Sequence, residues 1–250
     1  MKFWKCLDYL YPPRCPVCGE ISSDGICPVC TKKLFFVKEH YCMKCGKPLE
    51  AAEAEYCRDC SRRQHAFVRG RALLSYRGPV KLSLYRMKYG NRREYARVYG
   101  QTMAHRLGPW ICQCGIGLII PVPLHPSRKR KRGYNQAEWI AKGISDVLHI
   151  PVDTHTLYRV RRTKPQKKLN DIERKQNLQG AFSVKCALPP NACILLWMIF
   201  ILPEAPWMKQ PDVCKQRGSV RCMWQRLQSG DKKLFLHGDL CYTRHKVYQM

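Results

Sequence analysis

Four Cys-x-x-Cys pairs follow one another within residues 15–60, and their spacing constrains this chain more than any other feature. Two thiolates three positions apart on a tight turn direct their sulfurs at one centre, and two such turns complete the tetrahedron of a structural zinc site. Adjacent pairs are the simplest partners, although the spacing leaves interleaved pairing open. We therefore predict two structural zinc ions held by eight thiolates: Cys15, Cys18, Cys27, Cys30, Cys42, Cys45, Cys57 and Cys60.

Disulfide bonding is the alternative use of so many cysteines. We see no secretory signal ahead of the cluster, and regular Cys-x-x-Cys turns are poor disulfide partners for one another. The longest uncharged apolar run, residues 193–202, is about half the length of a membrane-spanning helix. We expect a cytoplasmic protein with no membrane partner. Cys112 and Cys114 lack the spacing of the four pairs and are expected to be incidental thiols.

The chain is strongly basic, with 45 Lys and Arg against 18 Asp and Glu and a formal net charge of +27. Such a surface favours phosphate-rich partners, either nucleic acid or a phosphorylated small molecule. A solvated basic face with no specific partner is the common alternative, and charge by itself does not choose between them.

After the last cysteine pair the pattern becomes that of an α/β domain. We expect strands over residues 66–76, 116–122 and 194–196, helices over 80–89, 92–107 and 135–148, and a loop over 124–134. The apolar β-branched run 116–122 is typical of a strand buried on both faces of a parallel sheet. Open α/β sheets bind ligands where strands end and helices begin, so this loop is a candidate phosphate site. Its candidate substrate-binding residues are Arg132, Gly133, Asn135 and Gln136.

The motifs, taken in order, resemble the ComF family of phosphoribosyltransferase-like proteins. They are the segment 7–13, the two cysteine ribbons, Pro-Val-Pro-Leu at 121–124, Arg-Gly-Tyr-Asn-Gln at 132–136, Thr163 with Gln166, and Arg-x-x-Asn-Leu-x-Gly-Ala-Phe at 174–182. The resemblance implies a double zinc ribbon, a type I phosphoribosyltransferase-like parallel sheet and a site for phosphoribosyl pyrophosphate. Intact relatives would also use magnesium, and in competent bacteria they would act in DNA uptake with single-stranded DNA and a competence helicase as partners.

The family pattern fails after Leu196. Type I phosphoribosyltransferases carry a strand ending in paired aspartates and a Thr-Thr-Gly loop, whereas this chain continues Trp-Met-Ile-Phe-Ile-Leu-Pro over residues 197–203. Trp has the single codon TGG and Met the single codon ATG. One base restored before the Trp197 codon therefore makes the bases read Val, or a similar residue, followed by Asp-Asp and by codons that permit Ile-Tyr-Thr-Thr-Gly. Our hypothesis is a one-base frameshift between residues 196 and 197, and a divergent natural C-terminus is the alternative.

These considerations divide the chain into three parts: a double zinc ribbon over 1–65, an incomplete phosphoribosyltransferase-like domain over 66–196 and an out-of-frame, poorly ordered tail over 197–250. We expect no catalytic residues in this product. The first functional hypothesis is an inactive ComF-type transferase homologue. The second is a module that binds single-stranded nucleic acid, with Tyr41, Tyr56 or Phe67 as stacking candidates. The third is a ribbon that docks a helicase-like partner.

Overall fold

A four-stranded parallel sheet forms the centre of the chain, in the order β1-β6-β5-β2. The computed structural model describes residues 12–51, 53–62, 67–164, 169, 171–185, 188, 192–198 and 221–229. A separate antiparallel pair joins β3 to β4. The strands are β1 (Arg69–Ser75), β2 (Leu118–Pro121), β3 (Leu157–Arg159), β4 (Phe182–Val184), β5 (Cys193–Met198) and β6 (Arg221–Ser229).

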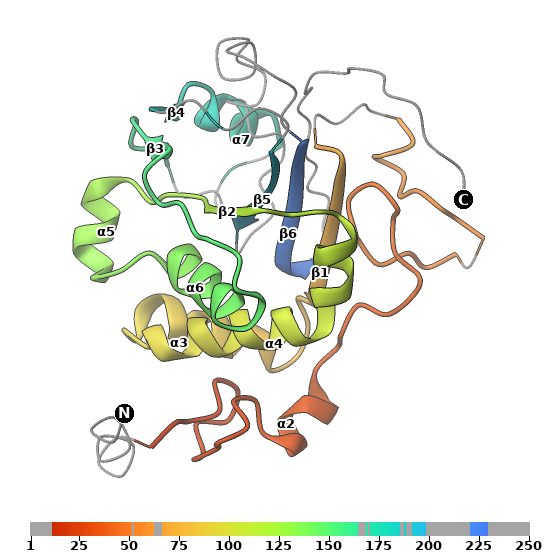
Figure 1. Cartoon of the computed structure of the whole chain (residues 1–250), viewed down its shortest axis with the longest axis vertical. Helices are drawn as coiled ribbons and strands as arrows, with labels where there is room; N and C mark the ends of the chain where they lie inside the picture. The colour runs from red at the N-terminus through yellow and green to blue at the C-terminus, as the bar shows by residue number, and fades with distance from the viewer. Residues whose placement is uncertain are drawn as a thin grey trace.

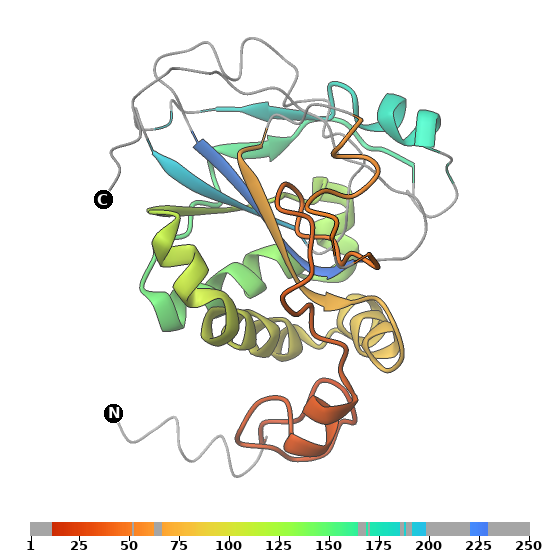
Figure 2. The same cartoon turned by 90° about the vertical axis from the view of Figure 1, so that its right-hand side faces the viewer.

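Helices pack on one side of this sheet, with the first cysteine ribbon beyond them. Figures 1 and 2 show α3, α4 and α6 on that side, and the β3–β4 pair with α7 at the opposite end of the molecule. None of the helices within the described ranges is both long enough and apolar enough to cross a membrane. The helices are α2 (Pro28–Lys33), α3 (Val80–Tyr89), α4 (Arg93–Gln113), α5 (Pro126–Arg132), α6 (Gln136–Leu148) and α7 (Asp171–Leu178).

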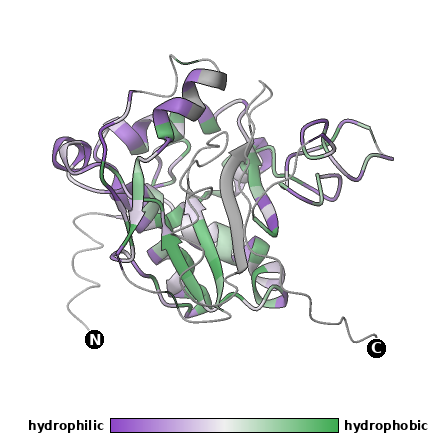
Figure 3. Ribbon diagram, turned by 90° about the horizontal axis from the view of Figure 1, so that it is seen from above, coloured by the Kyte–Doolittle hydropathy of each residue, from purple (hydrophilic) through white to green (hydrophobic). Residues whose placement is uncertain are grey.

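The central strands are buried on both faces, which confirms the prediction made from their apolar composition. Because strand side chains alternate between faces, Ile119 and Leu195 join the core beneath the helices, while Ile120 and Leu196 join a second core that contains Phe182. Figure 3 shows the result as hydrophobic central strands surrounded by largely hydrophilic outer segments.

Close contact between α4 and α6 depends on two glycines. A Cβ at Gly100 would lie 2.2 Å from the carbonyl oxygen of Ile140, and one at Gly143 would lie 2.3 Å from the carbonyl oxygen of Arg97. Both neighbours are backbone atoms of a packed helix and cannot turn aside. The two helices can therefore approach this closely only where both positions lack a side chain.

We expect Gly143→Ala to destabilise the fold, because the added methyl group forces α4 and α6 apart. Overpacking of this kind costs about 1–3 kcal/mol. The matched control is Gly117→Ala, where a Cβ would meet nothing within 4 Å. Thermal unfolding followed by circular dichroism should show a lower melting temperature for the first variant than for the second, and equal melting temperatures would contradict the packing argument.

The structure differs from the sequence predictions in two places: the end of α4, and the basic run before Gly133. Helix α4 continues through Pro109 to Gln113, six residues beyond the expected end, and buries Ile111 completely against the core. The basic run expected as a loop is helical as α5. Pro126 occupies its first turn, the His125 side chain accepts a hydrogen bond from the Ser127 amide, and Gly133 ends the helix in a left-handed conformation with φ 76°. These are ordinary capping signals, and they outweigh the absence of an apolar stripe.

A second difference concerns the segment expected to lie outside the sheet. Residues of Arg221–Ser229 form β6, which pairs in parallel with both β1 and β5. This segment can enter the sheet because strand pairing uses backbone amides and carbonyl groups. Any extended segment offers these groups, whatever its side chains. This segment includes residues 222–226, whose codons would permit the next strand of the family sheet under the frameshift hypothesis.

Candidate zinc centres and basic corner

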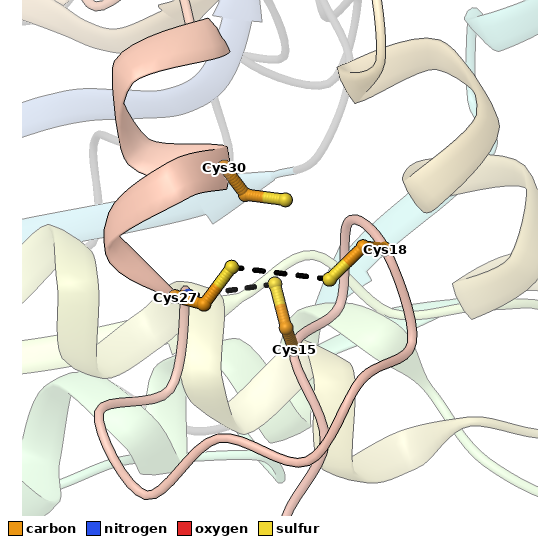
Figure 4. A group of neighbouring side chains, drawn as sticks. All are labelled: Cys15, Cys18, Cys27 and Cys30. Atoms are coloured by element: carbon orange, nitrogen blue, oxygen red, sulfur yellow. Dashed lines mark hydrogen bonds between the residues drawn. The ribbon is translucent and has the colours of Figure 1, made fainter.

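The first four cysteines converge on one point from a turn and a short helix. Cys27 is the N-cap of α2 and Cys30 lies within that helix, while Cys15 and Cys18 belong to the preceding turn. Their four sulfur atoms lie within 4.8 Å of one another, and Figure 4 shows them facing a common centre.

The second cluster repeats this arrangement with the sulfurs of Cys42, Cys45, Cys57 and Cys60, which again lie within 4.8 Å of one another. Adjacent pairing is therefore confirmed, and interleaved pairing is not what the fold adopts. The second ribbon is in direct contact with β1, because the amide of Gly70 donates to the carbonyl oxygen of Lys44 at 2.7 Å. Gly46 has φ +69°, and a Cβ there would lie 2.5 Å from the Cα of Arg71.

The geometry of both clusters fits zinc. A tetrahedron with zinc–sulfur bonds of about 2.3 Å has sulfur–sulfur edges of about 3.8 Å. The Sγ atoms of Cys18 and Cys27 are 3.8 Å apart, and so are those of Cys45 and Cys57. Two four-cysteine clusters of this shape are built for two structural zinc ions.

Each cluster lowers the pKa of some of its thiols and raises the pKa of others. Hydrogen bonds from Cys45 and then Cys57 hold the pKa of Cys42 well below its usual range. Burial raises the pKa of Cys15, but hydrogen bonds from the amides of Cys18 and Cys27 outweigh burial and lower it to about 7. Burial and then the neighbouring thiol of Cys27 raise the pKa of Cys30, and the thiols of Cys42 and Cys45 raise the pKa of Cys60, so zinc must displace protons from these two thiols when it binds.

The first ribbon is part of the main core. Cys15, Val17 and Cys30 belong to the same buried cluster as Leu84 and Met87 of α3. The hydroxyl of Ser83 donates to the carbonyl oxygen of Pro16 and lies 2.7 Å from the Tyr99 hydroxyl, all within the buried interface. Folding of this ribbon and packing of α3 are therefore coupled.

The predicted substrate-binding residues lie together, but two of them serve the fold. The side chain of Asn135 accepts from the Ala137 amide at 3.1 Å and donates to the Val122 carbonyl oxygen at 3.2 Å, which joins α6 to the end of β2. Asn135 and Gln136 are each 2% exposed. Nη1 of Arg132 donates to Gln136 Oε1 at 3.1 Å, and the guanidinium has further N–H groups that can donate to a ligand. Gly133 supplies the turn between the two helices.

Cations from three elements meet beside Arg132. We call Lys88, Arg128, Arg132 and Arg159 the basic corner. Nη2 of Arg128 donates to the carbonyl oxygen of Thr163 at 2.6 Å, and Arg159 donates to the hydroxyl of the same threonine. In the part of the chain that the structure describes, Arg128, Arg132 and Arg159 have no carboxylate partner.

Arg128 and Arg159 of the basic corner lie close to other positive charges. Burial and then the charges of Arg132 and Arg162 lower the pKa of Arg128. Burial and then the charges of Arg128 and Arg161 lower the pKa of Arg159, whose buried Nε has no hydrogen-bond partner among the residues that the structure describes. Arginine stays charged at neutral pH, so the corner retains its positive charge. An anion would relieve both the mutual repulsion and the unmet donor.

Sequence reasoning missed Lys88 and Arg159, which come from α3 and β3. Their contribution depends on contacts between distant segments, and only the excess of positive charge in the whole chain hinted at it. The Thr163 turn that holds Arg128 and Arg159 is itself anchored to α7. Asn177 exchanges two hydrogen bonds of 2.9 Å with the backbone of Lys164.

Comparison with known proteins agrees with the cysteine geometry. The double zinc ribbon domain matches residues 6–61. Competence protein F of Haemophilus influenzae is 44% identical over 66 residues, which cover 26% of this chain and 29% of that protein. DNA utilization protein YhgH of Salmonella typhi is 29% identical over 113 residues, covering 44% of this chain and 50% of the relative. The protein of the same name from Escherichia coli K12 is 28% identical over 113 residues. The matches therefore span half or less of these relatives.

Proposed function

We propose that this chain, whose double zinc ribbon and relatives support its membership of the ComF family, binds single-stranded DNA and does not transfer phosphoribosyl groups. One relative is named a competence protein and the other a DNA utilization protein, and the resemblance to the ComF family implies a role in DNA uptake. In this proposal the two zinc ions are structural, and DNA is held by its phosphates and bases.

The observation that carries the proposal is the basic corner. Three guanidinium groups from two elements gather without a carboxylate partner within the described ranges, and the Nε of Arg159 is buried without an acceptor. Arginine donors of this kind suit phosphate oxygens, because each planar group offers paired N–H bonds. A phosphodiester backbone can pair with these three guanidinium groups, which no carboxylate of the described residues does.

The residues at the end of β5 support the proposed absence of transfer activity. Phosphoribosyl transfer would need carboxylates there to hold ribose hydroxyls and a magnesium ion, and the sequence has no acid between residues 194 and 203. At the first position of the proposed frameshift stands Trp197, which is fully buried, yet its indole Nε1 finds no acceptor in the described part of the chain. A donor buried without a partner costs about 1–3 kcal/mol. Such an unfavourable contact is expected of a residue that selection did not place there. It therefore supports the frameshift hypothesis.

Binding should be measured by fluorescence anisotropy with a labelled 20-nucleotide dT strand over a series of salt concentrations. Each phosphate contact adds about 0.7 to the magnitude of the slope of log K against log salt for single strands. The double variant Arg128→Gln with Arg132→Gln should reduce this magnitude by about 1.4 if both residues contact phosphate. Lys32→Gln with Lys33→Gln removes the same charge from exposed positions on α2 and is the matched control.

Two results would contradict the proposal. One is the absence of binding by the zinc-loaded protein at low salt. The other is an equal loss of affinity and slope in the two double variants, since that would reduce the basic corner to a share of the net charge. Turnover in an exchange assay with phosphoribosyl pyrophosphate and magnesium would separately refute the claim of inactivity.

Binding should also weaken as the pH rises from 6 to 9. Burial and then the charge of Arg132 lower the pKa of Lys88 from 10.5 to about 7, so this ammonium group is present at pH 6 and largely lost at pH 9. DNA phosphate favours the charged form, and binding near neutral pH should therefore take up a proton. Because the folded pKa is below the unfolded one, Lys88 also makes the folded state less stable as the pH falls from about 10 to 7. Lys88→Met should remove most of the pH dependence of DNA affinity measured at constant salt, and an unchanged profile would exclude Lys88 as its source.

A further inference from the structure

We infer that the exposed face of α3 is a stacking platform on which the bases of single-stranded DNA lie, an inference that rests on the proposed DNA binding and supplies its base-contacting surface. We call Leu82, Tyr85 and Tyr89 the tyrosine stripe. These side chains are 52%, 61% and 65% exposed. Large exposed side chains that cluster on one helix commonly mark an interaction site.

The stripe is a regular feature of α3. Its members are three and four positions apart and therefore share one helical face, and the rings of Tyr85 and Tyr89 lie 4.7 Å apart at 44°. The opposite face of the helix supplies the buried residues Val80, Leu84 and Met87. Packing of α3 does not need the tyrosine rings, which leaves them free for a ligand.

The basic corner borders one side of the stripe. The guanidinium carbon of Arg132 lies 5.5 Å from the centre of the Tyr89 ring. Tyr89 also belongs to the electrostatic surroundings of Arg128, whose pKa it acts to raise against the stronger effect of burial. Phosphates held by these two arginines would lie within one nucleotide of the ring of Tyr89.

A groove borders the stripe where α3 meets the first ribbon. The groove has a volume of about 1480 Å³, and Arg14, Arg86, Gly90 and Arg92 are among the residues that line it, together with Glu94, whose carboxylate lies 3.6 Å from the Arg92 guanidinium. Arg86 reaches the carbonyl oxygen of Val17 at 3.4 Å, so the groove joins α3 to the ribbon. Gly90 follows Tyr89 directly. The tyrosine rings therefore lie between the basic corner and a groove that carries more arginines than acids.

Aromatic rings flanked by arginines on both sides fit a single strand better than other partners. A single strand exposes its base faces for stacking and carries a phosphate at every nucleotide, whereas a duplex hides those faces. An apolar protein surface would match the rings but leave the arginines unpaired at the interface. The arginines beside the stripe thus favour a polyanion as the partner. The rings favour a polyanion whose base faces are accessible for stacking.

The test is to replace both rings with alanine and measure binding of the labelled dT strand. Base stacking on one aromatic residue is worth about five- to more than a hundred-fold in affinity, so Tyr85→Ala with Tyr89→Ala should raise the Kd at least about tenfold. The salt slope should not change, because no phosphate contact is lost. Tyr85→Phe with Tyr89→Phe keeps the rings and should bind like the parent protein. Zinc content and melting temperature verify that each variant is folded.

The controls separate this inference from the proposed function. Tyr56, on the second ribbon, is 49% exposed, and Tyr56→Ala removes a ring of the same kind. Binding that is unaffected by the α3 double variant but lost in the Arg128 and Arg132 variant would overturn the stripe and leave DNA binding intact. A loss with Tyr56→Ala alone would overturn it in favour of the second ribbon. An effect of the alanine variants that appears only with an RNA strand of equal length would overturn the assignment to DNA.

Discussion

Replacing Cys30 with serine should remove one zinc ion and destabilise the whole chain, whereas replacing Cys57 should remove one zinc ion at a much smaller cost. Zinc bound to four thiolates contributes about 10–16 kcal/mol of apparent free energy to small zinc domains, and loss of one ligand forfeits part of it. The first ribbon shares the main core with α3 and α4 through Val17 and Cys30, so its disorder uncovers the inner surface of those helices.

The second ribbon has weaker connections to the core. Cys45 is a partly buried neighbour of the second hydrophobic cluster, and the ribbon also meets β1 through backbone contacts at Gly46 and Gly70 and through the Arg71 guanidinium, which lies 3.2 Å from the centre of the Tyr41 ring. A loss of about 4 kcal/mol in a chain of this size lowers the melting temperature by about 8–16 °C. We expect a shift of that order for Cys30→Ser and less than half of it for Cys57→Ser. Zinc should be counted by a colorimetric chelator and unfolding followed by circular dichroism. Equal shifts would contradict the coupling of the first ribbon to the core.

Local signals predicted those parts of the fold in which neighbouring residues carry the information. Pro79 before a helical apolar pattern gave α3 its observed bounds, Val80–Tyr89. The spacing of cysteine pairs predicted both metal clusters, because each pair is built by a single turn. Helix α5 was missed since its seven residues carry no apolar stripe, although its capping residues His125, Pro126 and Gly133 were readable.

Contacts between distant segments determine those parts of the fold and of the candidate site that the sequence did not predict. Lys88, Arg128 and Arg159 lie on three different elements, and no pattern within one segment reveals that they meet. The burial of Asn135 and Gln136 has a similar origin, since Asn135 is held by the carbonyl group of Val122 across the end of the sheet. Motif positions alone did not distinguish a residue that binds a ligand from one that holds the loop in shape.

Restoring one base ahead of the Trp197 codon should convert this chain into a protein that binds phosphoribosyl pyrophosphate with magnesium. The change would place two aspartates at the carboxyl end of β5, where the amide of Val122 now donates to the Trp197 carbonyl oxygen at 2.9 Å. Carboxylates there would lie at the end of β2, from which the chain leads directly into α5 and its arginines, so metal, ribose and phosphate could be held together. It would also replace the buried tryptophan by a smaller residue without an unmet donor.

Isothermal titration calorimetry with phosphoribosyl pyrophosphate and magnesium should detect saturable binding to the frame-restored protein and none to the present chain. The matched control carries the same inserted base with both new aspartates changed to asparagine, which keeps the shape of the strand while removing the charge that attracts magnesium. We expect that control to lose the magnesium-dependent part of the binding. If the restored protein and its asparagine control bind alike, or if the present chain binds as tightly as either, the carboxylates are not what this sheet lacks. Sequencing of the genomic DNA across codons 196 and 197 gives an independent reading, because an uninterrupted frame confirmed there would make the tryptophan a natural residue and remove the reason to expect a gain.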